Sequence, residues 1–294
     1  MVKLHYFNIT YCCDSDCMFC AANVGLIDHK GYTMKPDDVL EELRKSNVKK
    51  GDRVIINGGE PTLSPYFWQI LDVCDRLGCF IDLATNGHFF ADNDNVRKIL
   101  KYNLVAIRIP VFGLEKQHDH LTGVQGGYGK VIIALENLSK ITGNTNITVN
   151  VKFLLCKASV NSNPEVFEYL FEKYGTLFEY TLSPILVSRK AIKNKTELLL
   201  PYRELIAQSM DFIENENINC DIIPLCLLSQ NKRDSILKRK KVDFKKLYND
   251  AITHVNNMDN FQCNSCDDCR LNPFCDRFLP SYIKYFGSNE IAPF

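Results

Sequence analysis

Three cysteines near the start of the chain have the spacing of a metal-binding loop. Cys13, Cys17 and Cys20 follow a C-x3-C-x2-C pattern. Thiolates this close together can hold three corners of a cubane iron–sulfur cluster, which leaves the fourth iron without a protein ligand. An open position on a metal centre is typical of a reactive site rather than a structural one. A zinc site is the alternative, with His5 or His29 supplying the fourth ligand.

A second group of cysteines lies near the other end of the chain. Its four members, Cys263, Cys266, Cys269 and Cys275, bring the two groups to seven of the chain's 13 cysteines. The sequence has no export signal, and in a reducing compartment such close spacing favours metal or cluster ligation over disulfides. A structural zinc site built from four cysteines is the alternative.

The overall composition is that of an ordinary globular protein. Of 294 residues, 46% are hydrophobic and 24% charged, and the formal net charge is zero. No global field therefore attracts the chain to nucleic acid or to an anionic membrane. No apolar run approaches the roughly 18 residues of a membrane-spanning helix, and the first ten residues lack the apolar region of a signal peptide. We expect a cytoplasmic protein without nucleic-acid or membrane partners.

The elements that must position these cysteines alternate between strand and helix patterns up to about residue 218. Six strands are predicted, at 3–10, 53–58, 79–85, 104–111, 147–155 and 178–187. Helical periodicity follows each of them, at 36–48, 65–77, 94–102, 127–141, 164–174 and 201–217. Repeated β/α units predict a parallel sheet with right-handed crossovers. The predicted fold is α/β: a partial (β/α)6 barrel over 1–218, followed by a small cysteine-rich extension over 219–294, in which 219–228 could form one more strand.

Polar residues on the predicted strands indicate that the sheet is hollow. Buried parallel strands usually have apolar side chains on both faces. Here Asn150 and Lys152 alternate with apolar neighbours, and Arg108 interrupts an apolar strand. Such a polar inner face predicts a lumen that holds a polar ligand. The alternative is that these strands are solvent-exposed edges.

Three motifs together resemble the radical S-adenosylmethionine (SAM) family. The three-cysteine spacing follows the first predicted strand and has an aromatic, Phe19, before its last cysteine. Residues 57–61, Asn-Gly-Gly-Glu-Pro, close the second predicted strand like the family's GGEP segment. Residues 83–87, Leu-Ala-Thr-Asn-Gly, close the third, where the family places a polar residue near the cofactor. The resemblance covers roughly residues 1–190.

The resemblance implies a radical enzyme with two cofactors. A [4Fe–4S] cluster on the three cysteines would bind S-adenosylmethionine through its open iron, cleave it reductively and yield a radical that abstracts a substrate hydrogen. A flavodoxin or ferredoxin would supply the electron. The cofactor-binding residues implied are Phe19, Gly58, Gly59, Glu60 and Asn86, with Glu60 opposite the methionine ammonium. Arg108 and Lys152 would contact either the methionine carboxylate or the substrate.

The C-terminal cysteines resemble those of the SPASM and twitch subgroups, whose extension binds an auxiliary [4Fe–4S] cluster. In the twitch type an upstream cysteine, often after a proline, completes the ligand set. Cys226 in Ile-Pro-Leu-Cys matches it. The implied ligands are Cys226, Cys266, Cys269 and Cys275, with Cys263 or Cys220 as substitutes. The longer SPASM spacing is not completed after Cys275, so we expect one auxiliary cluster.

The best-known substrates of these subgroups are ribosomally made peptides, and peptide maturation is our first hypothesis. No leader-recognition domain precedes the first predicted strand, which counts against it. Dehydrogenation or rearrangement of a small molecule (a sugar, an amino acid or a cofactor precursor) is the second hypothesis. An electron-transfer or zinc-binding interaction protein is the third, although neither needs Glu60 or an open iron.

Two weaker signals remain. His118-Asp119 lies in the segment after the fourth predicted strand, where it is either solvated or functional. Residues 232–246 hold eight Lys or Arg against two Asp, which predicts a solvated helix face or a grip on a phosphate or an acidic peptide.

Overall fold

The chain folds around one seven-stranded, all-parallel sheet. The computed structural model describes residues 2–22, 24, 31–247, 266, 269, 271 and 275–291, with the backbone alone for 239–247. Each strand pairs with the next in chain order, so the sheet runs from β1 at one edge to β7 at the other. The strands are β1 (Leu4–Thr10), β2 (Arg53–Gly58), β3 (Phe80–Ala84), β4 (Leu104–Pro110), β5 (Thr148–Leu155), β6 (Glu179–Pro184) and β7 (Ile218–Cys220).

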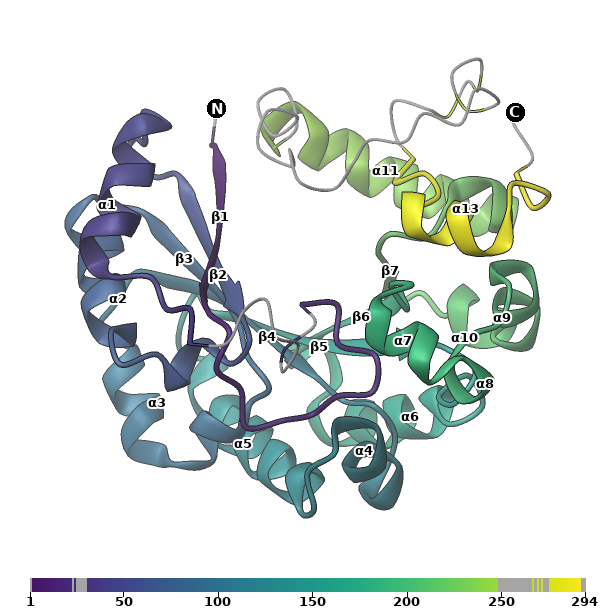
Figure 1. Cartoon of the computed structure of the whole chain (residues 1–294), viewed down its shortest axis with the longest axis horizontal. Helices are drawn as coiled ribbons and strands as arrows, with labels where there is room; N and C mark the ends of the chain where they lie inside the picture. Colours follow the sequence, from purple (N-terminus) through teal and green to yellow (C-terminus); the bar gives the residue numbers. More distant parts are fainter. Residues whose placement is uncertain are drawn as a thin grey trace.

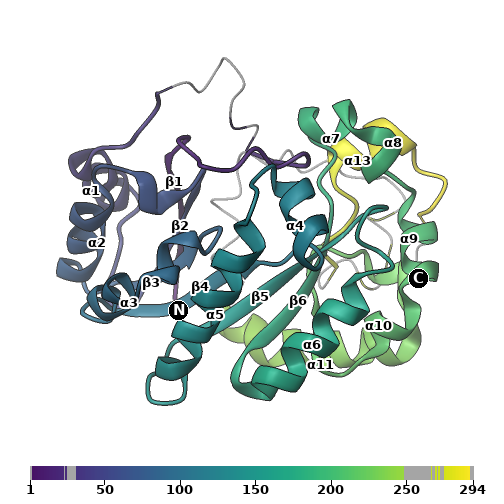
Figure 2. The same cartoon turned by 90° about the horizontal axis from the view of Figure 1, so that it is seen from below.

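The sheet curls into an open barrel with helices packed on its outer surface (Figures 1 and 2). The crossover helices are α1 (Pro36–Lys45), α2 (Phe67–Arg76), α3 (Asn93–Ile99), α4 (Glu115–Thr122), α5 (Gly127–Thr142) and α6 (Asn163–Tyr174). After β6 come α7 (Arg189–Lys193), α8 (Lys195–Leu198), α9 (Tyr202–Gln208) and α10 (Met210–Glu214). After β7 come α11 (Gln230–Leu247) and α13 (Pro280–Phe286). Among the residues described, no helix has the length and apolar character needed to cross a membrane.

Strand β5 shows why the sheet has one apolar and one polar face. Val149, Val151 and Phe153 are buried under the outer helices. The alternate residues, including Asn150 and Lys152, are partly exposed on the concave side. Since β5 is paired on both sides, by β4 and β6, the polar positions belong to an inner face and not to a sheet edge. The polar inner face predicted from the sequence is present.

The α/β class and the six predicted strands are confirmed, and a short seventh strand is added. Of the strand considered over 219–228, only the first two residues are paired, since Ile222 has a positive φ of 60° and Pro224 follows. The helix predicted over 201–217 is two helices, α9 and α10, separated at Ser209. Helix α4 was not predicted, because its apolar periodicity is weak.

The described C-terminal segment packs directly on the barrel. The ring of Tyr282 stacks on Tyr202 with centroids 3.9 Å apart, and its hydroxyl accepts a hydrogen bond from the Tyr202 amide (2.7 Å). The carboxylate of Glu290 accepts hydrogen bonds from the first two amides of α9, at Tyr202 and Arg203. These amides have no partner within the helix, so Glu290 caps it. The predicted domain boundary at residue 218 stays a prediction.

Helix α4 is anchored by a buried histidine. The imidazole Nδ1 of His118 accepts a hydrogen bond from the Phe112 amide (3.2 Å), and the ring stacks on Phe112. Because the side chain is buried, the pKa of His118 is lowered to about 4. The ring is therefore neutral near pH 7, which the acceptor role of Nδ1 requires. The sequence left open whether His118 is a solvated loop residue or a functional group. In the structure it is a buried residue of helix α4 with a structural hydrogen bond.

The buried histidine predicts a pH dependence of stability. Unfolding restores the pKa to about 6.5, so the unfolded chain binds more protons between pH 6.5 and 4, and stability falls as the pH falls through this window. His118→Asn keeps an oxygen acceptor for the Phe112 amide but cannot titrate. In urea unfolding, lowering the pH from 7 to 4.5 should destabilise the wild type by roughly 2 kcal/mol more than this variant. His120→Asn, an exposed position two residues away, is the control; equal losses in wild type and His118→Asn would contradict the assignment.

Candidate functional site

The three-cysteine loop leaves β1 at the carboxyl edge of the sheet and is held against the end of β2. The amides of Gly59 and Glu60 donate hydrogen bonds to the carbonyl oxygens of Thr10 and Cys12, each at 2.7 Å. A Cβ on Gly58 would lie 2.2 Å from the Thr10 oxygen, and one on Gly59 would lie 2.3 Å from the Cys12 oxygen. Both glycines are therefore needed so that the two backbones can approach each other.

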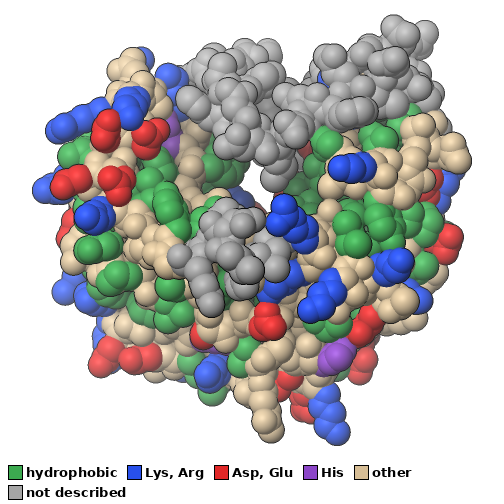
Figure 3. Space-filling view, in the orientation of Figure 1, with side chains coloured by type: hydrophobic (Ala, Val, Ile, Leu, Met, Phe, Trp, Pro, Cys, Tyr) green, Lys and Arg blue, Asp and Glu red, His purple; other side chains and the backbone are tan. Residues whose placement is uncertain are grey.

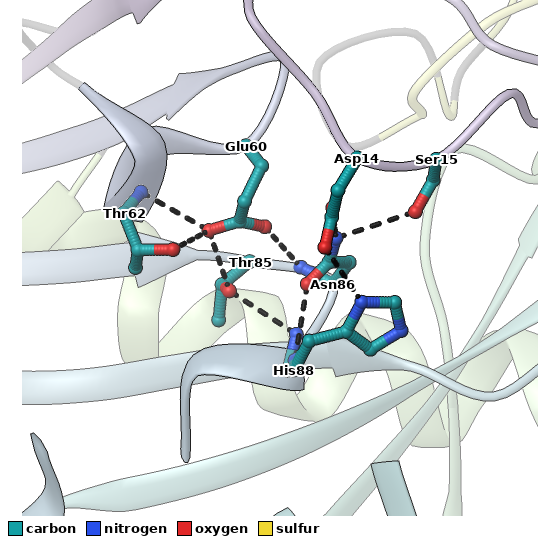
Figure 4. A network of polar contacts seen from close by, with 8 residues as sticks. Asp14, Ser15, Glu60, Thr62, Thr85, Asn86 and His88 are labelled. Carbon is teal, nitrogen blue, oxygen red and sulfur yellow. Dashed lines mark hydrogen bonds and ion pairs between the residues drawn. The ribbon is translucent and has the colours of Figure 1, made fainter. Parts of the chain in front are cut away.

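Glu60 joins the end of β2 to the end of β3. Its side chain is 2% exposed. One carboxylate oxygen accepts hydrogen bonds from the amide and hydroxyl of Thr62 (3.1 and 2.6 Å) and from the hydroxyl of Thr85 (2.9 Å); the other accepts one from the Asn86 amide (2.6 Å). Burial raises the pKa of Glu60, while these four donors oppose the rise by stabilising the anion. Figure 4 shows this network.

The segment after β3 reaches back to the cysteine loop. The Asn86 side-chain amide donates to the carboxylate of Asp14 (2.5 Å) and to the hydroxyl of Ser15 (3.3 Å). The His88 ring lies 2.9 Å from the other oxygen of Asp14, and the His88 amide donates to the Asn86 side chain. Asp14 and Ser15 stand between Cys13 and Cys17, so the loop, the β2 end and the β3 end form one hydrogen-bonded unit (Figure 4).

The far side of the loop is bonded to α4 and α7. The amides of Asp16 and Met18 donate to the carbonyl oxygens of Thr122 and Leu121, at the end of α4 (2.9 and 3.0 Å). The ring of Phe19 packs edge-on against Phe112, with centroids 4.5 Å apart. This contact connects the loop to the buried His118 described above, so Phe19 has a packing role in addition to its predicted place near the cofactor.

The thiols of this loop lie in a partly buried environment. Burial is the largest cause that raises the pKa of Cys13 to about 11 and of Cys17 to about 12, and the nearby charge of Cys20 adds to both. Such thiols stay protonated at neutral pH unless a bound cation compensates the charge of the thiolates. Among the residues that the structure describes, no three Cys, His, Asp or Glu side chains converge closely enough to hold a metal ion. The cysteine ligand sets therefore stay predictions.

Arg108 and Lys152 both lie on the concave face, where each pairs with a carboxylate. The guanidinium of Arg108 is 2.5 Å from Asp82, and the ammonium of Lys152 is 3.1 Å from Asp221. Burial lowers the pKa of Lys152, and the Asp221 charge opposes this. One oxygen of the buried Asp82 has no hydrogen-bond partner. The two cations thus lie beneath the carboxyl edge, within the lumen, and their predicted contact with cofactor or substrate is untested.

Two of the C-terminal cysteines lie close together. The sulfur of Cys275 accepts hydrogen bonds from the amides of Leu225 and Arg277, both at 3.3 Å. The charge of Cys226 raises the pKa of Cys275, after the larger effect of burial. Cys266 and Cys269 lie close together, since the amide of Cys269 donates a hydrogen bond to the Cys266 carbonyl (3.2 Å). Of the two substitutes, Cys220 ends β7, and Cys263 lies outside the described residues.

Sequence reasoning missed five residues of the hydrogen-bonded unit: Asp14, Ser15, Thr62, Thr85 and His88. Each lies within two residues of a motif residue, at position 13, 60 or 86. Polar side chains within or near a motif were the available signal, because such residues satisfy the buried groups of their neighbours. Which of them pair with one another across the fold had no such signal.

Comparison with known proteins agrees with this geometry. The model of the radical SAM superfamily matches residues 7–154. The mycofactocin maturase MftC of Mycolicibacterium smegmatis is 26% identical over 176 residues, which are 60% of this chain and 43% of that protein. The chain thus spans less than half the length of this relative.

Two solved structures have the same fold. SuiB of Streptococcus suis bound to the precursor peptide SuiA gives a TM-score of 0.54 at 18% identity, over 75% of this chain and 48% of that one. Native anSMEcpe with bound AdoMet gives a TM-score of 0.58 at 18% identity, over 77% of this chain and 65% of that one. The family match spans half of the sequence and includes the cysteine loop, the GGEP segment and the end of β3. This chain belongs to the radical SAM superfamily.

Proposed function

We propose that this protein is a radical enzyme that abstracts a hydrogen atom from an unactivated C–H bond of a ribosomally made peptide. One observation carries the proposal: the cysteine loop, the GGEP segment and the end of β3 form a single hydrogen-bonded unit at the carboxyl edge of the sheet, where active sites of β/α folds lie. We assign Cys13, Cys17 and Cys20 as the ligands of a [4Fe–4S] cluster that binds S-adenosylmethionine. When bound, the cluster supplies one electron for the reductive cleavage of S-adenosylmethionine.

The contribution of the chain itself is to hold the cluster loop in position. Backbone bonds from Gly59 and Glu60 fix its first part, Asn86 and His88 fix Asp14, and α4 fixes Asp16 and Met18. The carboxylate of Glu60 already has four protein donors and little exposure. We therefore infer that Glu60 acts on the cofactor mainly as a positioning residue, by fixing Asn86, with any bond to the methionine ammonium as a second effect.

The names of related proteins support a peptide substrate. MftC is a maturase, and SuiB was solved with a precursor peptide. The polar lumen, with Arg108 and Lys152 in partly buried ion pairs, favours a second candidate, a small polar substrate enclosed by the sheet. In both cases a low-potential protein such as a flavodoxin or ferredoxin would supply the electron.

We further propose an auxiliary [4Fe–4S] cluster on Cys226, Cys266, Cys269 and Cys275. The two amides that donate to the Cys275 sulfur support this assignment, because hydrogen bonds to the sulfurs are one means by which proteins tune iron–sulfur centres. The proximity of Cys226 to Cys275 supports it as well.

The two proposed ligand sets predict the iron content. Anaerobically reconstituted protein should bind about eight irons and eight sulfides per chain. Replacing Cys13, Cys17 and Cys20 by Ala should leave about four of each, and replacing the four C-terminal cysteines should do the same. Iron and acid-labile sulfide analysis measures both. Wild-type protein that takes up zinc alone, or a triple variant without iron, would rule out two clusters.

The Glu60 network predicts the effect of an isosteric substitution. In Glu60→Gln the side-chain NH2 must face the backbone N–H of either Thr62 or Asn86. Both groups are donors, and a backbone N–H cannot act as an acceptor. One buried amide then loses its acceptor, which should lower the free energy of unfolding by about 1–3 kcal/mol. S-adenosylmethionine affinity, measured by calorimetry on the reconstituted protein, should fall with it. Glu42→Gln, on the exposed face of α1, is the matched control. Full stability and affinity in Glu60→Gln would mean that the segment is only a turn.

A further inference from the structure

A cluster of cations lies beside the three-cysteine loop. It is formed by α7, α8 and the turn after β5, and we call it the basic patch: Lys157, Arg189, Lys190, Lys193 and Lys195. Four of these residues are exposed, all but Lys190. Figure 3 shows Lys and Arg side chains over this region, beside the central hollow. The chain has no formal net charge, so this concentration of positive charge is local.

The basic patch touches the loop that holds the proposed cluster. The ammonium of Lys190 is 2.5 Å from the carboxylate of Asp16. The side-chain amide of Asn194 donates to the Met18 carbonyl (3.0 Å), and the hydroxyl of Ser188 donates to the Phe19 carbonyl (3.4 Å). Helix α7 therefore contacts the loop on both sides of Cys17. Figures 1 and 2 both place α7 next to this loop.

Two carboxylates near the basic patch have partners among the described residues. Asp16 binds Lys190, and Glu197 binds His120 at 2.7 Å. Lys193 and Lys195 are exposed and project from short helices. The charge that the basic patch presents to solvent is therefore positive, and an exposed field of one sign steers a partner of the opposite sign.

We infer that the basic patch is the docking surface for the electron donor, an acidic flavin-bearing protein. This rests on the proposed function, since a radical SAM enzyme needs one electron for each cleavage. The flavin of the donor loses one electron and the bound cluster gains it, while no proton or group moves between the proteins. The basic patch places an acidic partner against the loop, on a surface that leaves the lumen open to the substrate.

The test compares two double charge reversals in the reconstituted protein. Lys193→Glu with Lys195→Glu changes the basic patch. Lys49→Glu with Lys101→Glu makes the same change in charge before β2 and β4, at the opposite edge of the parallel sheet. Cleavage of S-adenosylmethionine is driven either by reduced flavodoxin or by excess dithionite. Binding of oxidised flavodoxin is measured separately, at low and at physiological salt.

At low salt the basic-patch variant should lose at least about 10-fold in flavodoxin-driven rate and in flavodoxin affinity, while the control variant matches the wild type. Dithionite-driven cleavage should be unchanged in both. The difference should shrink at physiological salt, where the Debye length is about 8 Å.

Three results would overturn the inference: equal flavodoxin affinity in the two variants, an equal loss of dithionite-driven cleavage in the basic-patch variant, or loss of binding to an acidic precursor peptide with flavodoxin binding intact. A wild type that cleaves nothing with dithionite would refute the proposed function instead, and flavodoxin binding would still report on the basic patch.

Discussion

The site depends on the close approach of two backbones, the start of the cysteine loop and the end of β2. Successive amides, Gly59 and Glu60, bond to Thr10 and Cys12, and the glycines leave room for these bonds. The same segment then buries the carboxylate of Glu60, whose charge needs hydrogen-bond donors because it is 2% exposed to solvent. Thr62, Thr85 and Asn86 supply them, which fixes the end of β3 as well. The close approach of the chain at the ends of β1 and β2 therefore determines the position of all three motifs.

The interpretation of Glu60 changes when its surroundings are known. From the sequence it is an anion for a ligand ammonium. In the folded chain it is the centre of a protein network, and Asn86 is the link from that network to Asp14. The interpretation of Arg108 and Lys152 changes in the same way, because each cation already has a carboxylate partner in the lumen. A ligand of the lumen would have to compete with these pairs or bind beside them.

Much of the fold could be predicted from the sequence, because β/α repeats have strong periodicity and parallel strands with right-handed crossovers allow only a few chain topologies. The order of the strands and the polar face of β5 follow from such patterns. The position of α4 does not, since its contribution depends on His118 and on two carbonyl groups that bond to the distant loop. Side-chain pairs such as His88 with Asp14, 74 residues apart in the sequence, have no local signal.

Protein groups from four elements hold the cysteine loop by hydrogen bonds. These bonds run to β2, to the end of β3, to α4 and to α7, and those described above use backbone groups and polar side chains. The cluster that we propose on this loop would have one iron without a protein ligand, and such clusters are vulnerable to oxygen. A loop secured in this way should keep its shape when its iron is lost, so that damage by air would be repaired by reinsertion of iron and sulfide into a folded chain, without a new round of protein synthesis.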